Sequence, residues 1–111
     1  MRFEESRVGA VLVAKVLDAR IAADGAPRLK DCLAGYIVRG NRSIVLDLAD
    51  VTFIDSGGLG ALISILKSLG KDGELVISGA RSAVAGMFRL TRMDQVFQML
   101  ESNELAVAAL S

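Results

Sequence analysis

Apolar positions along the chain change their spacing in a way that predicts strands followed by helices. Val11, Val13 and Val16 stand among small or polar residues, which fits one or two β-strands forming the first edge of a sheet. After Pro27, which suits a first helical turn, the apolar spacing becomes that of a helix, with Leu29, Cys32, Leu33, Tyr36 and Ile37. We expect an amphipathic helix here, with Cys32 on its buried face.

The middle of the chain predicts a strand, a tight turn and a second helix. Ile44 to Leu48 is a nearly continuous, β-branched apolar run of the kind found in a central parallel strand, and Val51 to Ile54 extends it or forms a short continuation. Asp55-Ser56-Gly57-Gly58 closes the strand. Helical spacing then resumes from Leu59 to Leu69, and Gly70 ends the helix.

The last third of the chain continues the alternation of strand and helix. Leu75 to Ile77 predicts a short strand, and Ser82 is placed to cap a helix. Thr91 with Asp94 resembles a capping box. Residues 96–100 fit either a strand or a helix, and residues 104–110 predict a terminal helix. These elements define one α/β domain over residues 1–111, with helices on at least one face of the sheet.

Composition narrows the chemistry that such a domain can perform. A chain of 111 residues that is 52% apolar is long enough for one core and too short for two. Its 13 basic and 13 acidic residues are scattered, so direct binding to nucleic acid is not expected. Cys32 is the single cysteine and histidine is absent, which disfavours an internal disulfide, a metal centre and histidine-dependent catalysis. We expect neither a cofactor nor a metal.

The N-terminus predicts a cytoplasmic protein. Glu4 and Glu5 stand where a secretory signal would need a positive segment followed by an apolar run. Apolar stretches are also far shorter than the roughly 20 residues needed to cross a bilayer, so no membrane insertion is expected.

Ser56 is the residue that attracts a functional interpretation. Its position before a helix suits an ordinary N-cap, whose hydroxyl accepts a backbone N–H. The glycines at 57 and 58 are costly in a helix, and they leave room for another protein to approach the hydroxyl. Catalytic interpretations lack their parts: no histidine completes a triad, and Leu59 stands where a Ser-x-x-Lys motif would need lysine. No enzyme is therefore expected.

The same segment resembles a known signature. Residues 46–60, Leu-Asp-Leu-Ala-Asp-Val-Thr-Phe-Ile-Asp-Ser-Gly-Gly-Leu-Gly, are similar to the D-L-S-x-V-x-F-I-D-S-S-G-L-G motif of the STAS domain. This family includes bacterial anti-sigma factor antagonists and the cytoplasmic tails of sulfate transporters. Residues 26–30, 75–77 and 90–94, together with Phe97, also resemble the family, so nearly the whole chain is covered. The resemblance implies a mixed sheet of about four to five strands, with helices mainly on one face.

The resemblance also implies a partner-switching function, in which the chain corresponds to a stand-alone antagonist. In that family a kinase that is also the anti-sigma factor phosphorylates the serine after the aspartate, here Ser56, and a serine phosphatase reverses the step. The unphosphorylated form would bind the kinase and the phosphorylated form would release it. The partner contacts implied are Asp55, Ser56, Gly57, Gly58, Leu59 and Met93. Gly57 replaces a frequent second serine, and Ala22 replaces an aspartate of the family pattern.

Two other functions remain open at this point. The glycines and the helix N-terminus could hold an anion or nucleotide without any phosphorylation. Alternatively, the chain is a scaffold subunit of a signalling complex, with Ser56 as a simple cap. Arg20, Lys67 and Arg92 are interpreted as solvated charges.

Overall fold

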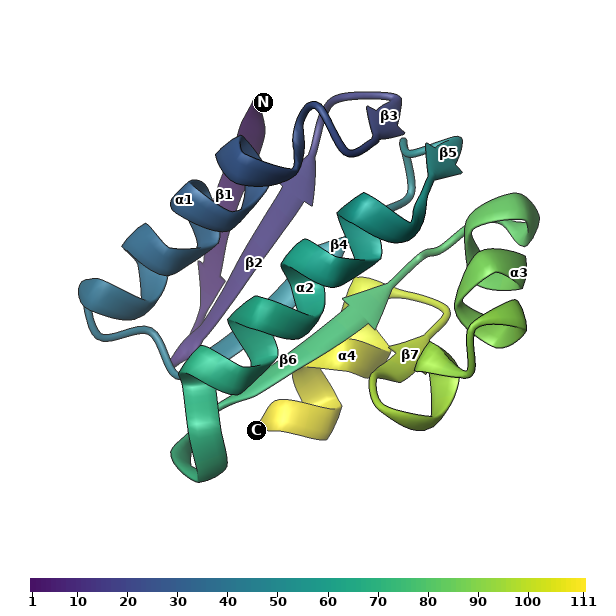
Figure 1. The fold of residues 1–111 in the computed structure, drawn as a ribbon. Helices are drawn as coiled ribbons and strands as arrows, with labels where there is room; N and C mark the ends of the chain where they lie inside the picture. The colour runs from purple at the N-terminus through teal and green to yellow at the C-terminus, as the bar shows by residue number, and fades with distance from the viewer.

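A five-stranded mixed sheet forms the centre of the computed structural model, which describes residues 1–111 (Figure 1). Its spatial order is β1-β2-β4-β6-β7, with β1 antiparallel to β2 and every other pair parallel. The strands are β1 (Phe3–Val8), β2 (Val11–Val16), β4 (Ser43–Asp47), β6 (Glu74–Ser78) and β7 (Gln98–Leu100). The predicted α/β fold, with a mixed sheet of about four to five strands, is confirmed.

Two further strands, β3 (Arg20–Ile21) and β5 (Phe53–Ile54), form a small parallel sheet of their own. They lie beyond the ends of β2 and β4, close to the start of the second helix (Figure 1). The run from Val51 to Ile54 therefore does not extend β4, and only its last two residues form a strand.

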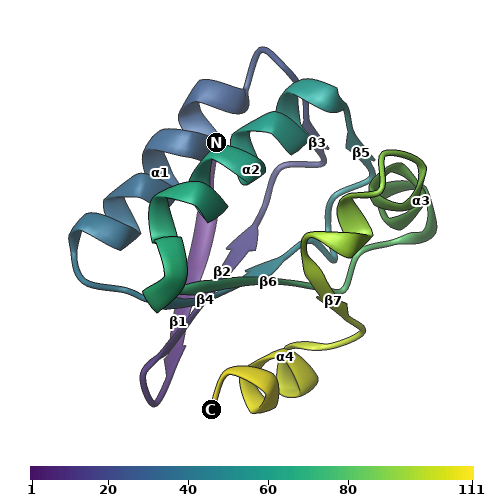
Figure 2. The ribbon, with the colours of Figure 1, turned by 60° about the horizontal axis from the view of Figure 1, so that its bottom comes forward.

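Four α-helices cover the sheet unequally. Figure 2 shows α1 and α2 side by side over one face, while α4 lies on the opposite face. The helices are α1 (Ala26–Val38), α2 (Ser56–Leu69), α3 (Ser82–Leu90) and α4 (Asn103–Leu110), with 3-10 turns η1 (Gly70–Asp72) and η2 (Met93–Gln95). The prediction that helices pack mainly on one face is confirmed. None of the helices combines the length and apolar character needed to cross a membrane.

Two hydrophobic clusters follow from the two-residue period of the strands. On the α1–α2 face, 22 buried residues form the main core, which includes Ile44 and Leu46 from β4. Val45 points the other way, into a five-residue cluster with Val11, Val13, Val76 and Ala106 under α4. Because β4 is buried on both faces, its run reads as continuously apolar in the sequence.

Several local predictions are wrong. Cys32 is half-buried on α1 and not part of the core. The sheet edge is β1 and not the valine-rich β2. Ser82 is the first residue of α3, where Arg81 holds the cap position. Thr91 ends α3, and its hydroxyl donates back to the Met87 carbonyl at 2.8 Å, so no capping box forms.

Candidate functional site

The turn from β5 into α2 is organised by Asp55. This residue has an extended backbone and is the N-cap of α2, and its Oδ1 accepts the Gly58 N–H at 3.0 Å. Ser56 is the first helical residue, is exposed, and makes no side-chain hydrogen bond. The interpretation of Ser56 as an N-cap is therefore wrong. Since Asp55 satisfies the helix end, the Ser56 hydroxyl remains available.

Asp55 also ties the turn to the loop after β3. Its Oδ2 accepts the Ala23 N–H at 3.1 Å, and its own N–H donates to the Ile21 carbonyl at 3.2 Å. The Gly58 and Ala23 N–H groups, in that order, hold the pKa of Asp55 below its ordinary value, and the nearby Arg20 charge adds to this effect. The carboxylate next to Ser56 is therefore negatively charged at neutral pH.

The two glycines serve internal packing. A Cβ on Gly57 would lie 2.7 Å from both Cα and Cβ of Ala23, and one on Gly58 would lie 2.6 Å from the Ile21 carbonyl oxygen. Both distances are shorter than real side chains allow, so glycine is required for α2 to approach the β3 segment. Packing against Ile21 and Ala23 therefore explains both glycines, and the interpretation that they also leave room for another protein stays a prediction.

The expected partner contacts differ in accessibility. Asp55 and Gly57 are half-buried beside the exposed Ser56, so all three reach the surface. Gly58 and Leu59 are buried, Leu59 to 3% exposure, and they shape the turn from inside. Met93 is half-buried in η2 and packs against the main core. Of the six expected partner contacts, residues 55–57 therefore share one accessible surface.

Arg20 and Phe53 complete this surface, and sequence reasoning did not include them. Pairing of β3 with β5 sets the two residues opposite each other, and the Arg20 guanidinium carbon lies 4.4 Å from the centre of the Phe53 ring. Phe53 is 39% exposed, which is high for a large apolar side chain. The one available signal in the sequence was Arg20-Ile21, which is similar to the start of the arginine, hydrophobic residue, aspartate pattern of the STAS family.

An open groove of about 550 Å³ begins beside this turn and runs between α1 and α2. Small residues on α2, namely Gly57, Gly60 and Ala61, form one side of it, and Lys30 and Asp31 stand on the α1 side. The small side chains leave a shallow surface next to Ser56 that a folded partner could contact.

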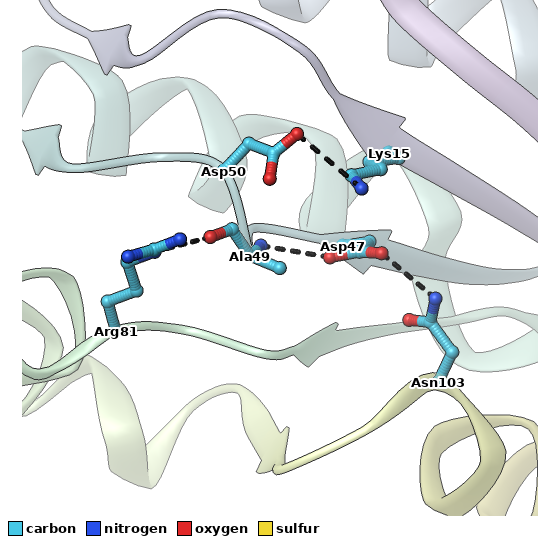
Figure 3. A network of polar contacts seen from close by, with 6 residues as sticks. All are labelled: Lys15, Asp47, Ala49, Asp50, Arg81 and Asn103. Carbon is cyan, nitrogen blue, oxygen red and sulfur yellow. Dashed lines mark hydrogen bonds and ion pairs between the residues drawn. The ribbon is translucent and has the colours of Figure 1, made fainter.

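A polar network at the ends of β4 and β6 fixes the chain that leads toward β5 (Figure 3). The buried Asp47 accepts the Ala49 N–H and the Asn103 side-chain amide, both at 2.9 Å. Arg81 donates to the Ala49 carbonyl at 2.5 Å, and the Ser78 hydroxyl donates to the side-chain oxygen of Asn103. The turn after β4 is thereby anchored to α4 and to the start of α3, which limits its movement.

Comparison with known proteins identifies the family. The model of the STAS domain matches residues 11–106, and the chain belongs to this family. BtrV of Bordetella bronchiseptica, a candidate anti-sigma factor antagonist, is 29% identical over 110 residues, covering 98% of this chain and 94% of its own. The anti-sigma-B factor antagonist of Staphylococcus aureus is 31% identical over 80 residues, covering 71% of this chain and 74% of its own.

Solved structures show the same fold. An anti-sigma factor antagonist from Mycobacterium paratuberculosis superposes with a TM-score of 0.89 at 24% identity, covering 98% of this chain and 92% of the other. SpoIIAA of Bacillus in its phosphorylated form gives a TM-score of 0.72 at 15% identity, covering 99% of this chain and 100% of the other. At these identities the likeness concerns the fold.

Proposed function

We propose that this protein is an anti-sigma factor antagonist of a partner-switching pathway, regulated by phosphorylation of Ser56. The observation that carries the proposal is the state of that hydroxyl: exposed, without a hydrogen bond, and at the first position of α2. An acceptor for a kinase must be reachable and free. Because Asp55 caps the helix, Ser56 can be modified without loss of a bond that holds the fold.

The chemistry of the switch is a phosphoryl transfer in each direction. The kinase moves the γ-phosphoryl group of a nucleoside triphosphate to Oγ of Ser56, the nucleoside diphosphate leaves, and the hydroxyl proton passes to a base of the kinase. A serine phosphatase restores the hydroxyl by hydrolysis, releasing inorganic phosphate. Both partners act in the cytoplasm in this proposal, and the chain itself is the substrate.

The added charge should change binding far more than folding. A phosphate carries about −1.5 to −2 charges at neutral pH, and the N-terminus of α2 tolerates an anion. In a closely packed interface, however, the phosphate would lie next to the ionised Asp55, and both would lose water. Near-complete release of a bound partner requires about 5.5 kcal/mol of differential affinity. The free-energy cost of desolvating a dianion beside a carboxylate is large enough to supply much of this difference in affinity.

The proposed contact surface lies around the switch residue. It comprises Asp55, Ser56 and Gly57 at the turn, with Arg20 and Phe53 beside them. The open groove between α1 and α2 continues this surface away from the turn. Met93 stays in the proposal as a peripheral contact through its exposed part.

Binding of a free anion or nucleotide at the same turn is the weaker alternative. The Gly58 N–H already donates to Asp55, and the carboxylate places a negative charge where the ligand would have to sit. A covalently attached phosphate can tolerate that charge, while a freely dissociating anion would be repelled.

The experiment compares Ser56→Ala and Ser56→Asp for binding to the cognate anti-sigma kinase, with Ser82→Asp as the matched control. Ser82 is also an exposed serine at the first position of a helix, α3. We expect Ser56→Ala and Ser82→Asp to bind as wild type does, and Ser56→Asp to bind at least about 100-fold more weakly, or about 2.7 kcal/mol. Equal binding by all of these proteins would support the scaffold function instead.

A further inference from the structure

The outer edge of β1 is a long strand edge with nothing paired to it. Of the two edges of the central sheet, β7 offers three residues and β1 offers six. Natural proteins commonly blunt such an edge with proline, a bulge, a covering segment or charged side chains, and of these devices β1 has only the charges of Glu4, Glu5 and Arg7. β1 contains no proline, pairs with β2 in an unbroken register from Phe3 to Val8, and five of its six residues are exposed.

The backbone groups on this edge can be assigned from the hairpin geometry. Gly9 and Ala10 form a two-residue connection, so Val8 and Val11 close the turn as a hydrogen-bonded pair. Arg2 is likewise bonded inward, since its carbonyl accepts the Leu17 N–H at 2.9 Å. Bonded pairs alternate along an antiparallel ladder, so the N–H and C=O groups of Phe3, Glu5 and Arg7 point outward. No backbone hydrogen bond outside regular structure involves these three residues.

From this edge we infer that the protein associates with a second copy of itself, by antiparallel pairing of β1 with β1 in a register centred on Ser6. Outward-facing residues must stand opposite one another, which allows a centre at any residue from Phe3 to Arg7. A centre at Glu4 or Glu5 sets that carboxylate against its own copy, and a centre at Arg7 sets two guanidinium groups together. A centre at Phe3 pairs neither Glu5 nor Arg7 with a residue of the partner's β1. Only the centre at Ser6 pairs Glu5 with the partner's Arg7, and it does so twice by symmetry.

The side chains at these two positions make no ion pair within the chain. Glu5 and Arg7 project to the α1 face, as does Phe3, whose ring meets that of Tyr36 edge-on at 6.1 Å. The one ion pair within the chain joins Lys15 to Asp50, so neither Glu5 nor Arg7 is ion-paired in its own chain, and Glu5 lies beside the Tyr36 hydroxyl, whose pKa is raised by burial first and then by Glu5. Arg7 donates through Nη2 to the Asn41 Oδ1 at 2.7 Å, which positions the guanidinium and leaves its other donors available.

The pairing would leave the proposed switch untouched. Figure 1 shows β1 at one margin of the sheet and the turn between β5 and α2 toward the other. Two strands paired in this register exchange about four backbone hydrogen bonds at the Glu5 and Arg7 positions. The dimer would therefore join two sheets into one, with both Ser56 residues exposed, so this inference does not depend on phosphorylation.

The test is sedimentation equilibrium over about 10 μM to about 1 mM protein, a range that covers weak association. The wild type is expected to rise in mean mass from 11.7 kDa toward twice that value. Glu5→Arg and Arg7→Glu should each weaken association at least about tenfold, because two attractive contacts become repulsive in every dimer. Glu101→Arg, the same charge change at an exposed turn residue, should associate as wild type does.

Mixing the two single variants separates this register from any general loss of folding. In the mixed dimer every cross-strand pair is again opposite in charge, so the mean mass should recover to that of the wild type. Recovery would confirm both the strand and its register. A wild type that stays at 11.7 kDa would overturn the inference, as would association unchanged by either variant or a mixture that fails to recover.

Discussion

The packing of α2 against the β3 segment predicts that Gly58→Ala destabilises the protein. The new Cβ would lie 2.6 Å from the Ile21 carbonyl oxygen, 2.7 Å from Ile21 Cγ2 and 3.0 Å from Ile54 Cγ1. Overpacking of this kind costs about 1–3 kcal/mol, while alanine returns at most about 1 kcal/mol of helix propensity. We expect a net loss of about 1–2 kcal/mol in the free energy of unfolding.

Gly60→Ala is the matched control, because Gly60 lies in the same helix and has no atom within 4 Å of its would-be Cβ. This variant should gain about 0.5–1 kcal/mol. Urea unfolding followed by circular dichroism gives both values, with unchanged slopes showing that stability alone has moved. If Gly58→Ala unfolds at the same or a higher urea concentration than Gly60→Ala, the close approach to Ile21 is refuted.

Three further predictions follow from the polar groups. The pKa of Asp55 is lowered in the fold, so its contribution to stability is present above the ordinary value of 3.8 and is lost as pH falls through the folded value. Asp55→Asn should therefore reduce the loss of unfolding free energy at acidic pH, measured by unfolding experiments at several pH values. A loss equal to that of the wild type would contradict the prediction. Burial first, and then Glu5, raise the pKa of Tyr36 to about 12. Tyr36 is the single tyrosine, so ultraviolet titration should show no ionisation near pH 10 while the protein is folded, and a midpoint there would count against the packing. Asn103→Ala should lose about 1–3 kcal/mol of stability by leaving the buried Asp47 and Ser78 short of a partner, measurable as a lower urea midpoint.

Elements with a strong local pattern were predictable from the sequence. The run from Ile44 to Leu48 identified the central strand because β4 is buried on both faces, and Gly70 marked the end of α2 because it adopts a positive φ of 65° there. β1 left no signal, since five of its six residues are exposed and show no alternation.

The site was located correctly in the sequence, but its internal roles were not. Asp55 and Ser56 are both good N-cap residues one position apart, so local pattern alone could not decide which of them holds α2. The need for Gly57 and Gly58 depends on Ile21 and Ala23, more than 30 positions earlier in the chain. β3 has two residues, too few to show any period, so this contact could be found only in three dimensions.

The central claim is that Ser56 is the phosphorylated residue, and intact mass spectrometry of protein purified from its own cells tests it most directly. Wild type and Ser82→Ala should each carry a single phosphate under some growth conditions, and Ser56→Ala should carry none, because Ser56 is the exposed serine beside the Asp55 cap. A phosphate that persists in Ser56→Ala, or one that never appears in the wild type, would contradict the proposed switch.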